Sequence, residues 1–157
     1  MQQQVNSVFA VADVFNNEAL EEREDMTPLK LIKLCYIAYG FYLGYGKGKL
    51  FREKIEAWKY GPVIPALYHD LKKYKGSPIR ESLRYDGPPL DDHEKLFVQK
   101  VWKAYKKFSG LDLTNLTHQK GTPWREVYDK TFRFSAIIPD ASIKAYYEGI
   151  IETGYGT

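Results

Sequence analysis

The sequence predicts a mainly α fold with a minor β component. It predicts one domain over residues 1–157, a helical bundle with a small β-hairpin or sheet near residues 49–59. Apolar residues recur at helical spacing through most of the chain, and two Thr-Pro pairs have the form of helix starts. Alternation of the strand type is confined to a few residues. A length of 157 residues suits one domain, and no linker or internal repeat divides the chain.

Two helices are expected in the first third of the chain. An apolar stripe places the first at about residues 4–21. The members of this stripe are Val5, Val8, Phe9, Ala12 and Phe15. Thr27 as N-cap and Pro28 as first helical residue begin the second helix, which runs to about Leu43. This second segment is apolar on most sides, so we expect it to be central and buried. The glycines after it do not follow a strand, as a phosphate-binding loop would.

Strand signals come next in the chain. Lys49–Phe51 and Ile55–Trp58 are typical of two short strands. Tyr60-Gly61-Pro62 then supplies a breaker at which a strand ends and a helix begins, and helical spacing places that helix at about residues 63–74. Residues 76–90 are rich in proline and glycine, which predicts an irregular connection with at most one short strand.

A third long helix opens at Asp91, whose spacing to Glu94 is that of a capping box. Its expected core stripe consists of Phe97, Val101, Ala104, Tyr105 and Phe108. Gly110 is expected to end this helix, and a short helix is expected at about residues 113–119.

The last part of the chain predicts two more helices. Thr122 caps the first of them and Pro123 starts it. The second begins near Pro139-Asp140 and carries one helical face of apolar and aromatic residues. That face consists of Ile143, Tyr146, Tyr147 and Ile150.

Composition bounds the location and the partners. The net charge is +3, which is too balanced to indicate nucleic acid by itself, and the lysine clusters at 47–59 and 72–75 are most simply solvated faces. Cys35 is the one cysteine and lies in an apolar run, which indicates a buried structural thiol and excludes an intrachain disulfide. We expect no signal peptide and no membrane span, hence a cytoplasmic protein without a membrane partner.

The residues offer no catalytic or metal site, and no cofactor is expected. His69, His93 and His118 stand in no metal-ligand spacing, and no serine lies in a nucleophile elbow. His118 is the most informative histidine because it leads into the helix that Pro123 starts. Three roles remain open for it: a histidine bonded to nearby backbone, a general acid or base, and a contact to a partner.

Three sequence blocks resemble those of the Panacea domain family, which includes SocA-like antitoxins and the phage-associated protein GepA. The first block is the helix Leu29–Tyr42, and the second is the corner Ala57–Val63 followed by Leu67-Tyr68. The third combines Leu116-Thr117-His118 with Pro123-Trp124. The corner is the most specific of the three.

The resemblance implies a non-enzymatic protein, an antitoxin that binds and neutralises a cognate toxin. One branch of the family implies a proteolytic adaptor that delivers the toxin to the ClpXP protease. The alternatives are a phage-encoded module that acts on a host protein and a weak nucleic-acid-binding protein. The expected partner-binding or family-motif residues are Trp58, Tyr60, Gly61, Pro62, Tyr68, His118, Pro123 and Trp124. Their side chains either join the small sheet to the helices or contact the partner.

Overall fold

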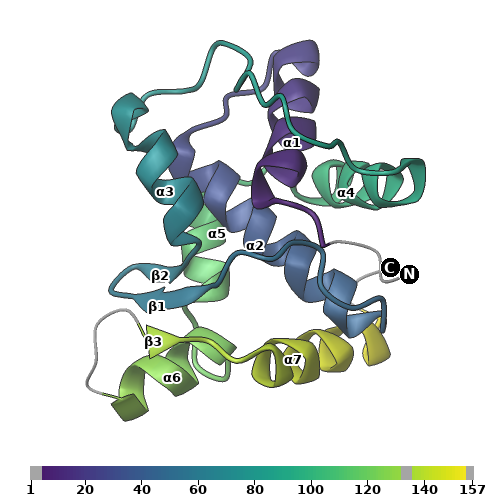
Figure 1. Cartoon of the computed structure of the whole chain (residues 1–157). Helices are drawn as coiled ribbons and strands as arrows, with labels where there is room; N and C mark the ends of the chain where they lie inside the picture. The colour runs from purple at the N-terminus through teal and green to yellow at the C-terminus, as the bar shows by residue number, and fades with distance from the viewer. Residues whose placement is uncertain (1–4, 132–135, 155–157) are drawn as a thin grey trace.

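The computed structural model describes residues 5–131 and 136–154, and it confirms a mainly α fold with a minor β component (Figure 1). The α-helices are α1 (Val8–Glu22), α2 (Pro28–Gly44), α3 (Pro65–Leu71), α4 (Asp92–Tyr105), α5 (Gly110–Thr117), α6 (Pro123–Thr131) and α7 (Asp140–Glu152). A 3₁₀ turn, η1 (Lys72–Tyr74), extends α3. The strands are β1 (Glu56–Trp58), β2 (Gly61–Val63) and β3 (Ala136–Ile137).

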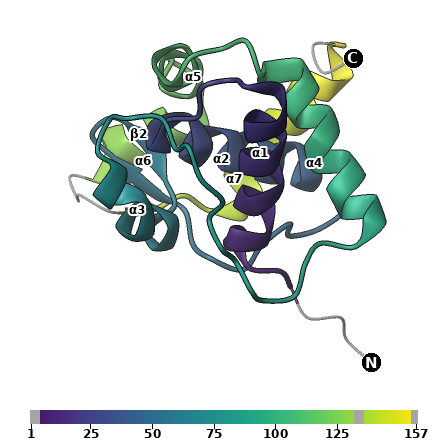
Figure 2. The same ribbon diagram turned by 90° about the horizontal axis from the view of Figure 1, so that it is seen from above.

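Helix α2 is the centre of the molecule, as its nearly continuous apolar sequence predicts. It begins as expected: the Thr27 hydroxyl accepts a hydrogen bond from Lys30 N, and Pro28 is the first helical residue. Helices α1, α3, α4, α5 and α7 and strand β2 all contact it. Figures 1 and 2 show α2 crossing the middle of the fold, with α1 and α4 side by side on one side of it.

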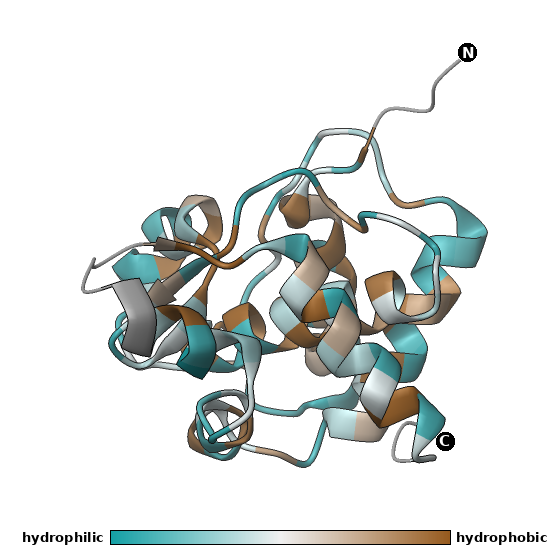
Figure 3. Ribbon diagram, turned by 90° about the horizontal axis from the view of Figure 1, so that it is seen from below, coloured by the Kyte–Doolittle hydropathy of each residue, from teal (hydrophilic) through white to brown (hydrophobic). Residues whose placement is uncertain are grey.

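Helix α7 packs closely on α2 because α2 carries two glycines one turn apart. A Cβ atom at Gly40 would overlap the ring of Tyr147, and one at Gly44 would lie 3.0 Å from Ile151 Cδ1. The apolar face predicted for α7 is confirmed: Ile143 and Tyr147 are buried. Hydrophobic segments recur along helices that are otherwise hydrophilic, as Figure 3 shows.

The small sheet differs from the predicted one. Its order is β2-β1-β3, all antiparallel, and Trp58 pairs with Gly61 across a two-residue turn. The predicted strand at 49–51 is wrong. There Leu50 and Phe51 are buried in the core, and Arg52 N donates to Asn6 O rather than to a strand.

The predicted breaker is also wrong, because Gly61–Val63 is itself strand β2. Proline lacks the N–H that a central strand needs, but β2 is an edge strand and tolerates Pro62. Helix α3 therefore begins at Pro65 and, with the 3₁₀ turn, reaches Tyr74. The connection that follows is irregular, as predicted, and no strand forms in residues 76–90.

The capping box predicted for α4 is present in full, since Glu94 N donates to Asp91 and the Glu94 carboxylate accepts from Asp91 N. The predicted core stripe of α4 is correct in part: Val101 is buried and the half-buried Phe97 and Tyr105 pack against the core, whereas Ala104 and Phe108 are exposed. The helix also buries Val98 and Trp102, which the predicted stripe did not include. The helix ends at Tyr105 rather than at Gly110, because a second capping box at Ser109 starts α5 there.

Helix α1 begins at Val8, four residues later than predicted. Ser7 is its N-cap, and the Glu53 carboxylate accepts hydrogen bonds from Val8 N (2.7 Å) and from the Ser7 hydroxyl. A carboxylate at a helix N-terminus satisfies an otherwise free N–H and interacts favourably with the helix dipole.

No helix in the described part of the chain is long and apolar enough to cross a membrane.

Candidate functional site: a clamped hairpin tip

The tip of the β1–β2 hairpin is the exposed end of the predicted corner. Lys59 and Tyr60 form its two-residue turn, and Tyr60 is 67% exposed. The Lys59 ammonium lies 5.5 Å from the centre of the Tyr60 ring, within range of a cation–π contact. The side chain of Tyr60 therefore points away from the core although its backbone is firmly held.

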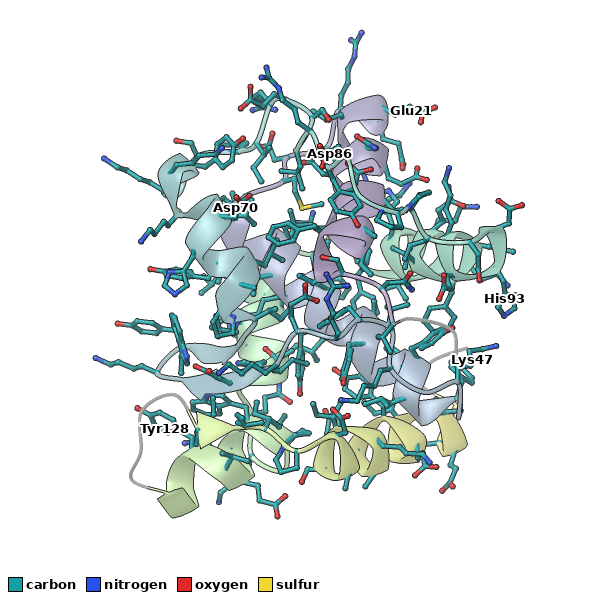
Figure 4. The ribbon with its side chains drawn as sticks, viewed as in Figure 1. Glu21, Lys47, Asp70, Asp86, His93 and Tyr128 are labelled. Carbon is teal, nitrogen blue, oxygen red and sulfur yellow. The ribbon has the colours of Figure 1, made fainter. Side chains whose placement is uncertain are left out.

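Two aromatic donors hold the outgoing side of the tip. Trp124 Nε1–H, from α6, donates to Trp58 O at 2.6 Å. His118 Nε2, at the C-terminal cap of α5, lies 3.3 Å from Lys59 O. The His118 ring stacks on the Trp124 ring with centres 4.0 Å apart, so each ring fixes the other. Tyr128, one turn further along α6, stacks on the Trp124 ring with centres 4.7 Å apart (Tyr128 is labelled in Figure 4).

A buried lysine holds the returning side. Lys33 Nζ, from α2, donates to Tyr60 O at 3.2 Å and to Pro62 O at 2.8 Å. Lys33 is 1% exposed, and burial lowers the pKa of its ammonium to about 7. Both acceptors are neutral carbonyl oxygens, which stabilise an ammonium less than a carboxylate does. We call Lys33, His118 and Trp124 the carbonyl clamp.

Gly61 is required by the carbonyl clamp. Its φ is +114°, in a region that side chains rarely adopt. A Cβ atom there would lie 2.8 Å from Lys33 Nζ. Glycine thus lets the ammonium approach the backbone of the tip on both sides of position 61.

A second aromatic pair lies beside the tip. The half-buried Trp58 ring packs edge to face on Tyr68 of α3, with centres 5.1 Å apart. Trp58 Nε1–H donates to the Glu56 carboxylate at 2.9 Å. Tyr68 is 37% exposed and lies next to the His69 ring. The pair therefore joins α3 to the sheet and also presents aromatic surface to solvent.

The predicted residues from two distant blocks come together at this one place. Gly61, Pro62, Pro123 and Trp124 are buried there, and Trp58 and His118 are half-buried. Tyr60 and Tyr68 are exposed. Of the three roles left open for His118, its geometry is that of a histidine bonded to nearby backbone.

Lys33 is the residue of this site that sequence reasoning missed. The available signal was a lysine inside a run of helix that is apolar on most sides, since a charge is rarely buried without a specific partner. The sequence alone does not show which groups accept hydrogen bonds from the Lys33 ammonium.

Other candidate groups lie apart from the site. Lys47 and His93 approach each other to 3.1 Å between the end of α2 and the start of α4 (Figure 4). Cys35 is buried, and burial raises the pKa of its thiol well above the ordinary value. Among residues 5–131 and 136–154, no cluster of three histidine, cysteine or carboxylate side chains could hold a metal ion.

A family model described as "Antitoxin SocA-like, Panacea domain" matches residues 31–125. The chain belongs to the Panacea domain family. The matched region runs from α2 into α6, so it includes all three residues of the carbonyl clamp. The resemblance that the three sequence blocks carry is thereby confirmed.

This Panacea domain is also similar to Antitoxin SocA of Caulobacter vibrioides (strain NA1000 / CB15N). The two are 30% identical over 129 residues, which cover 73% of this chain and 66% of the relative. The chain thus spans slightly less than two thirds of that relative's length. No solved structure matches the chain.

Proposed function

We propose that this Panacea domain is a non-catalytic antitoxin that binds and neutralises a cognate protein toxin, with the hairpin tip as the contact. The observation that carries the proposal is an exposed tyrosine on a backbone held by the carbonyl clamp. The family and the similarity to an antitoxin support the role.

A clamped tip is well suited to binding a protein. Tyrosine is enriched among binding hot spots because it offers a large rigid contact and one polar atom. A turn already fixed in place loses little conformational entropy on association. In this proposal Tyr60 and Tyr68 contact the toxin. The supporting residues beneath them are Trp58, Gly61, Pro62, His118, Pro123 and Trp124.

Charge pairing within residues 47–59 reduces the support for a nucleic-acid partner. Lys49 lies 3.3 Å from the Asp140 carboxylate, and Lys54 lies 3.7 Å from that of Glu56. These two paired lysines offer less positive charge to a phosphate backbone than the sequence of this segment suggests.

The first test is co-expression with the product of the adjacent reading frame. We expect growth to be rescued and the two proteins to co-purify. Tyr60→Ala should weaken the complex about 30-fold, the loss typical of a hot spot, without changing the melting temperature. A harmless neighbouring product that forms no complex would overturn the proposal.

Tyr45→Ala is the matched control. Tyr45 is 47% exposed and follows α2 at its C-terminal end, twelve residues beyond Lys33 and thus about 18 Å further along the helix. We expect this variant to bind the toxin as the unsubstituted protein does. Equal weakening by both substitutions would argue against the hairpin tip as the contact.

The substitution Trp124→Phe tests whether Trp124 supports the hairpin tip or contacts the toxin itself. It keeps an aromatic ring against His118 but removes the N–H that Trp58 O accepts. We expect the free energy of unfolding to fall by about 1–3 kcal/mol, because a partly buried carbonyl loses its hydrogen-bond donor. Weaker toxin binding with unchanged stability would instead assign Trp124 to the interface.

Neutralisation by direct binding and delivery to ClpXP give different outcomes. Direct binding predicts that rescue persists in cells without ClpX and that the toxin's half-life is unchanged. Delivery predicts that rescue is lost and that the toxin is stabilised when ClpX is absent. A third outcome is that the protein co-purifies with a host protein and that the adjacent gene encodes no toxin. That outcome would favour a phage-encoded module that acts on a host protein, as the resemblance to the phage-associated protein GepA suggests.

A further inference from the structure

The charge excess of the protein is concentrated in residues 59–75, which run from the hairpin tip through β2 and α3 to η1. This segment has four lysines and one carboxylate, all exposed: Lys59, Asp70, Lys72, Lys73 and Lys75. With histidine counted as neutral, its formal charge is +3, the same as the net charge of the whole chain. The whole chain has 23 basic and 20 acidic residues, so the 19 of each kind outside this segment balance one another.

The four lysines of this segment have no acidic partner in the described part of the chain. None of their ammonium groups lies within 4.0 Å of a described carboxylate, whereas Lys106, for example, lies 2.7 Å from Glu22. Lys59 and Lys73 instead lie over the rings of the tyrosines next to them, 5.5 Å and 5.3 Å from the ring centres. A cation–π contact at an exposed site is weak, so these charges remain available to an outside partner.

The lysines border the exposed aromatic surface of the tip. The Trp58 ring packs on that of Tyr68, which connects the tip to α3, and Figure 1 shows α3 leaving the hairpin on the side to which the tip points. Lys72 N donates to Tyr68 O, so Lys72 follows Tyr68 by one helical turn and lies on the same side of α3. Ammonium groups therefore stand at both ends of an aromatic contact. We call Lys59, Tyr60, Tyr68, Lys72 and Lys73 the basic aromatic face.

Carboxylates beside the basic aromatic face are balanced by other cations. At the tip, the Glu56 carboxylate is paired with Lys54. Beyond η1, Glu81 accepts a hydrogen bond from the Tyr74 hydroxyl at 2.8 Å and raises the pKa of Tyr74, and Arg84 opposes this shift. Both neighbouring carboxylates thus have a compensating positive charge, and the face itself stays positive.

We propose that the basic aromatic face binds an acidic protein surface, whose carboxylates meet the lysines and whose apolar side chains cover Tyr60 and Tyr68. That this surface belongs to the toxin rests on the proposed function. Complementary charge of this kind raises association rates and disfavours partners of like charge, while the tyrosines supply the contact area. Single-stranded nucleic acids are bound along continuous basic grooves, whereas the lysines here lie at two ends of a projecting turn and helix (Figure 1).

The first test needs no toxin. The full 157-residue chain, labelled with ¹⁵N, is titrated with the capped peptide Glu-Glu-Leu-Leu-Glu-Glu, with the neutral peptide Gln-Gln-Leu-Leu-Gln-Gln and with oligothymidylate. We expect the acidic peptide to give saturable shifts within residues 59–75 and to bind at least about tenfold more tightly than the neutral one. Equal binding of the two peptides, no saturable shifts, or tighter binding of oligothymidylate would each overturn the proposal.

The second test measures the affinity for the product of the adjacent reading frame at about 50 mM and about 500 mM salt. The double variant Lys72→Glu, Lys73→Glu should bind about tenfold more weakly at low salt and about twofold more weakly at high salt, because salt screens exposed charges. Tyr60→Ala should weaken binding by the same factor at both salt concentrations, since an apolar contact is not screened.

Two controls are matched to the charge-reversed variant. Lys100→Glu with Lys103→Glu makes the same change of charge at exposed positions of α4 and should leave the affinity unchanged. Lys72→Arg with Lys73→Arg keeps the charge and should bind as the unsubstituted protein does. Equal weakening by both charge-reversed variants, or by the arginine variant, would overturn the proposal.

The two tests separate this inference from the proposed function. If the adjacent product binds but neither salt nor Lys72→Glu with Lys73→Glu changes its affinity, the acidic partner surface is refuted and the proposed function stands. If the adjacent product does not bind, the proposed function falls, and the peptide titration alone decides whether the face binds acidic protein surfaces.

Discussion

The buried ammonium of Lys33 predicts that this protein becomes more stable as the pH rises through neutrality. Burial lowers the pKa of Lys33 to about 7 from an ordinary 10.5. Between these values the unfolded chain holds a proton that the folded protein has released. Stability therefore increases with pH in this window, and the penalty for burying the charge is fully present below pH 7.

The size of the effect follows from the same two values. Their full difference corresponds to about 5 kcal/mol, reached only near pH 10.5. Between pH 6 and pH 8 the expected gain is about 1.4 kcal/mol. This lower window avoids Cys35 and the buried tyrosines, whose raised pKa values reduce stability only when the pH exceeds their ordinary values of 9 to 10.

Urea unfolding at pH 6.0 and pH 8.0, followed by tryptophan fluorescence, measures the gain. Lys33→Met and Lys33→Gln should lose about 1.4 kcal/mol of pH dependence relative to the unsubstituted protein, because neither side chain titrates. Gln retains a donor for the tip carbonyls and should be the more stable of the two. Lys144→Met, at an exposed position of α7, should keep the full dependence. Equal pH dependence in all four proteins would refute a pKa near 7.

Three further predictions concern packing. In the same urea assay, Gly61→Ala should reduce the free energy of unfolding by about 3 kcal/mol, because of backbone strain and a clash with the Lys33 ammonium. The control Gly48→Ala is also at positive φ but in open space, and it should reduce the free energy of unfolding by about 1 kcal/mol. Gly40→Ala should cost about 3 kcal/mol because its Cβ overlaps an α7 ring, while Gly149→Ala, which meets nothing, should stabilise by about 0.5–1 kcal/mol. Cys35 should not react with a thiol reagent in the folded protein and should react at once in denaturant; reaction at similar rates would show that the thiol is accessible.

Helix starts were predictable because their determinants are local. Thr27, Asp91 and Thr122 each accept a hydrogen bond from an N–H three residues ahead, so the sequence itself contains both partners. The end of α4 was less predictable because two signals compete there. Gly110 is typical of a helix end, but here it is the first residue of α5 after the N-cap Ser109.

The sheet was poorly predicted because its partners are distant. β1 pairs with β3, about eighty residues later in the chain, and two-residue β3 has no periodicity of its own to detect. Pro62 indicated a break, and only the position of β2 at the sheet edge makes a strand possible there. In such short strands the tertiary context outweighs local strand propensity.

The sequence named most of the residues that meet at the candidate site, but not Lys33, and it did not show which of them face inward and which face solvent. The family resemblance named the corner and the Pro123-Trp124 block, which the fold brings into contact through Trp58 O. Whether each side chain faces inward or outward depends on how α2, α5 and α6 converge, which no local pattern encodes. Lys33 was missed for the same reason, since its acceptors lie 27 and 29 residues further along the chain.

The carbonyl clamp has a consequence for partner recognition. Its donors hold the tip through backbone oxygens, which every residue type provides, and not through the side chains of the turn. Apart from the Lys59 cation–π contact, no described interaction of the fold depends on the Tyr60 ring. The fold therefore constrains where the turn lies while leaving the side chains at 59 and 60 free to suit a partner. Under the proposed function, substitutions at the tip should alter which partner is bound, whereas substitutions in the clamp should alter whether the tip is held in place for binding.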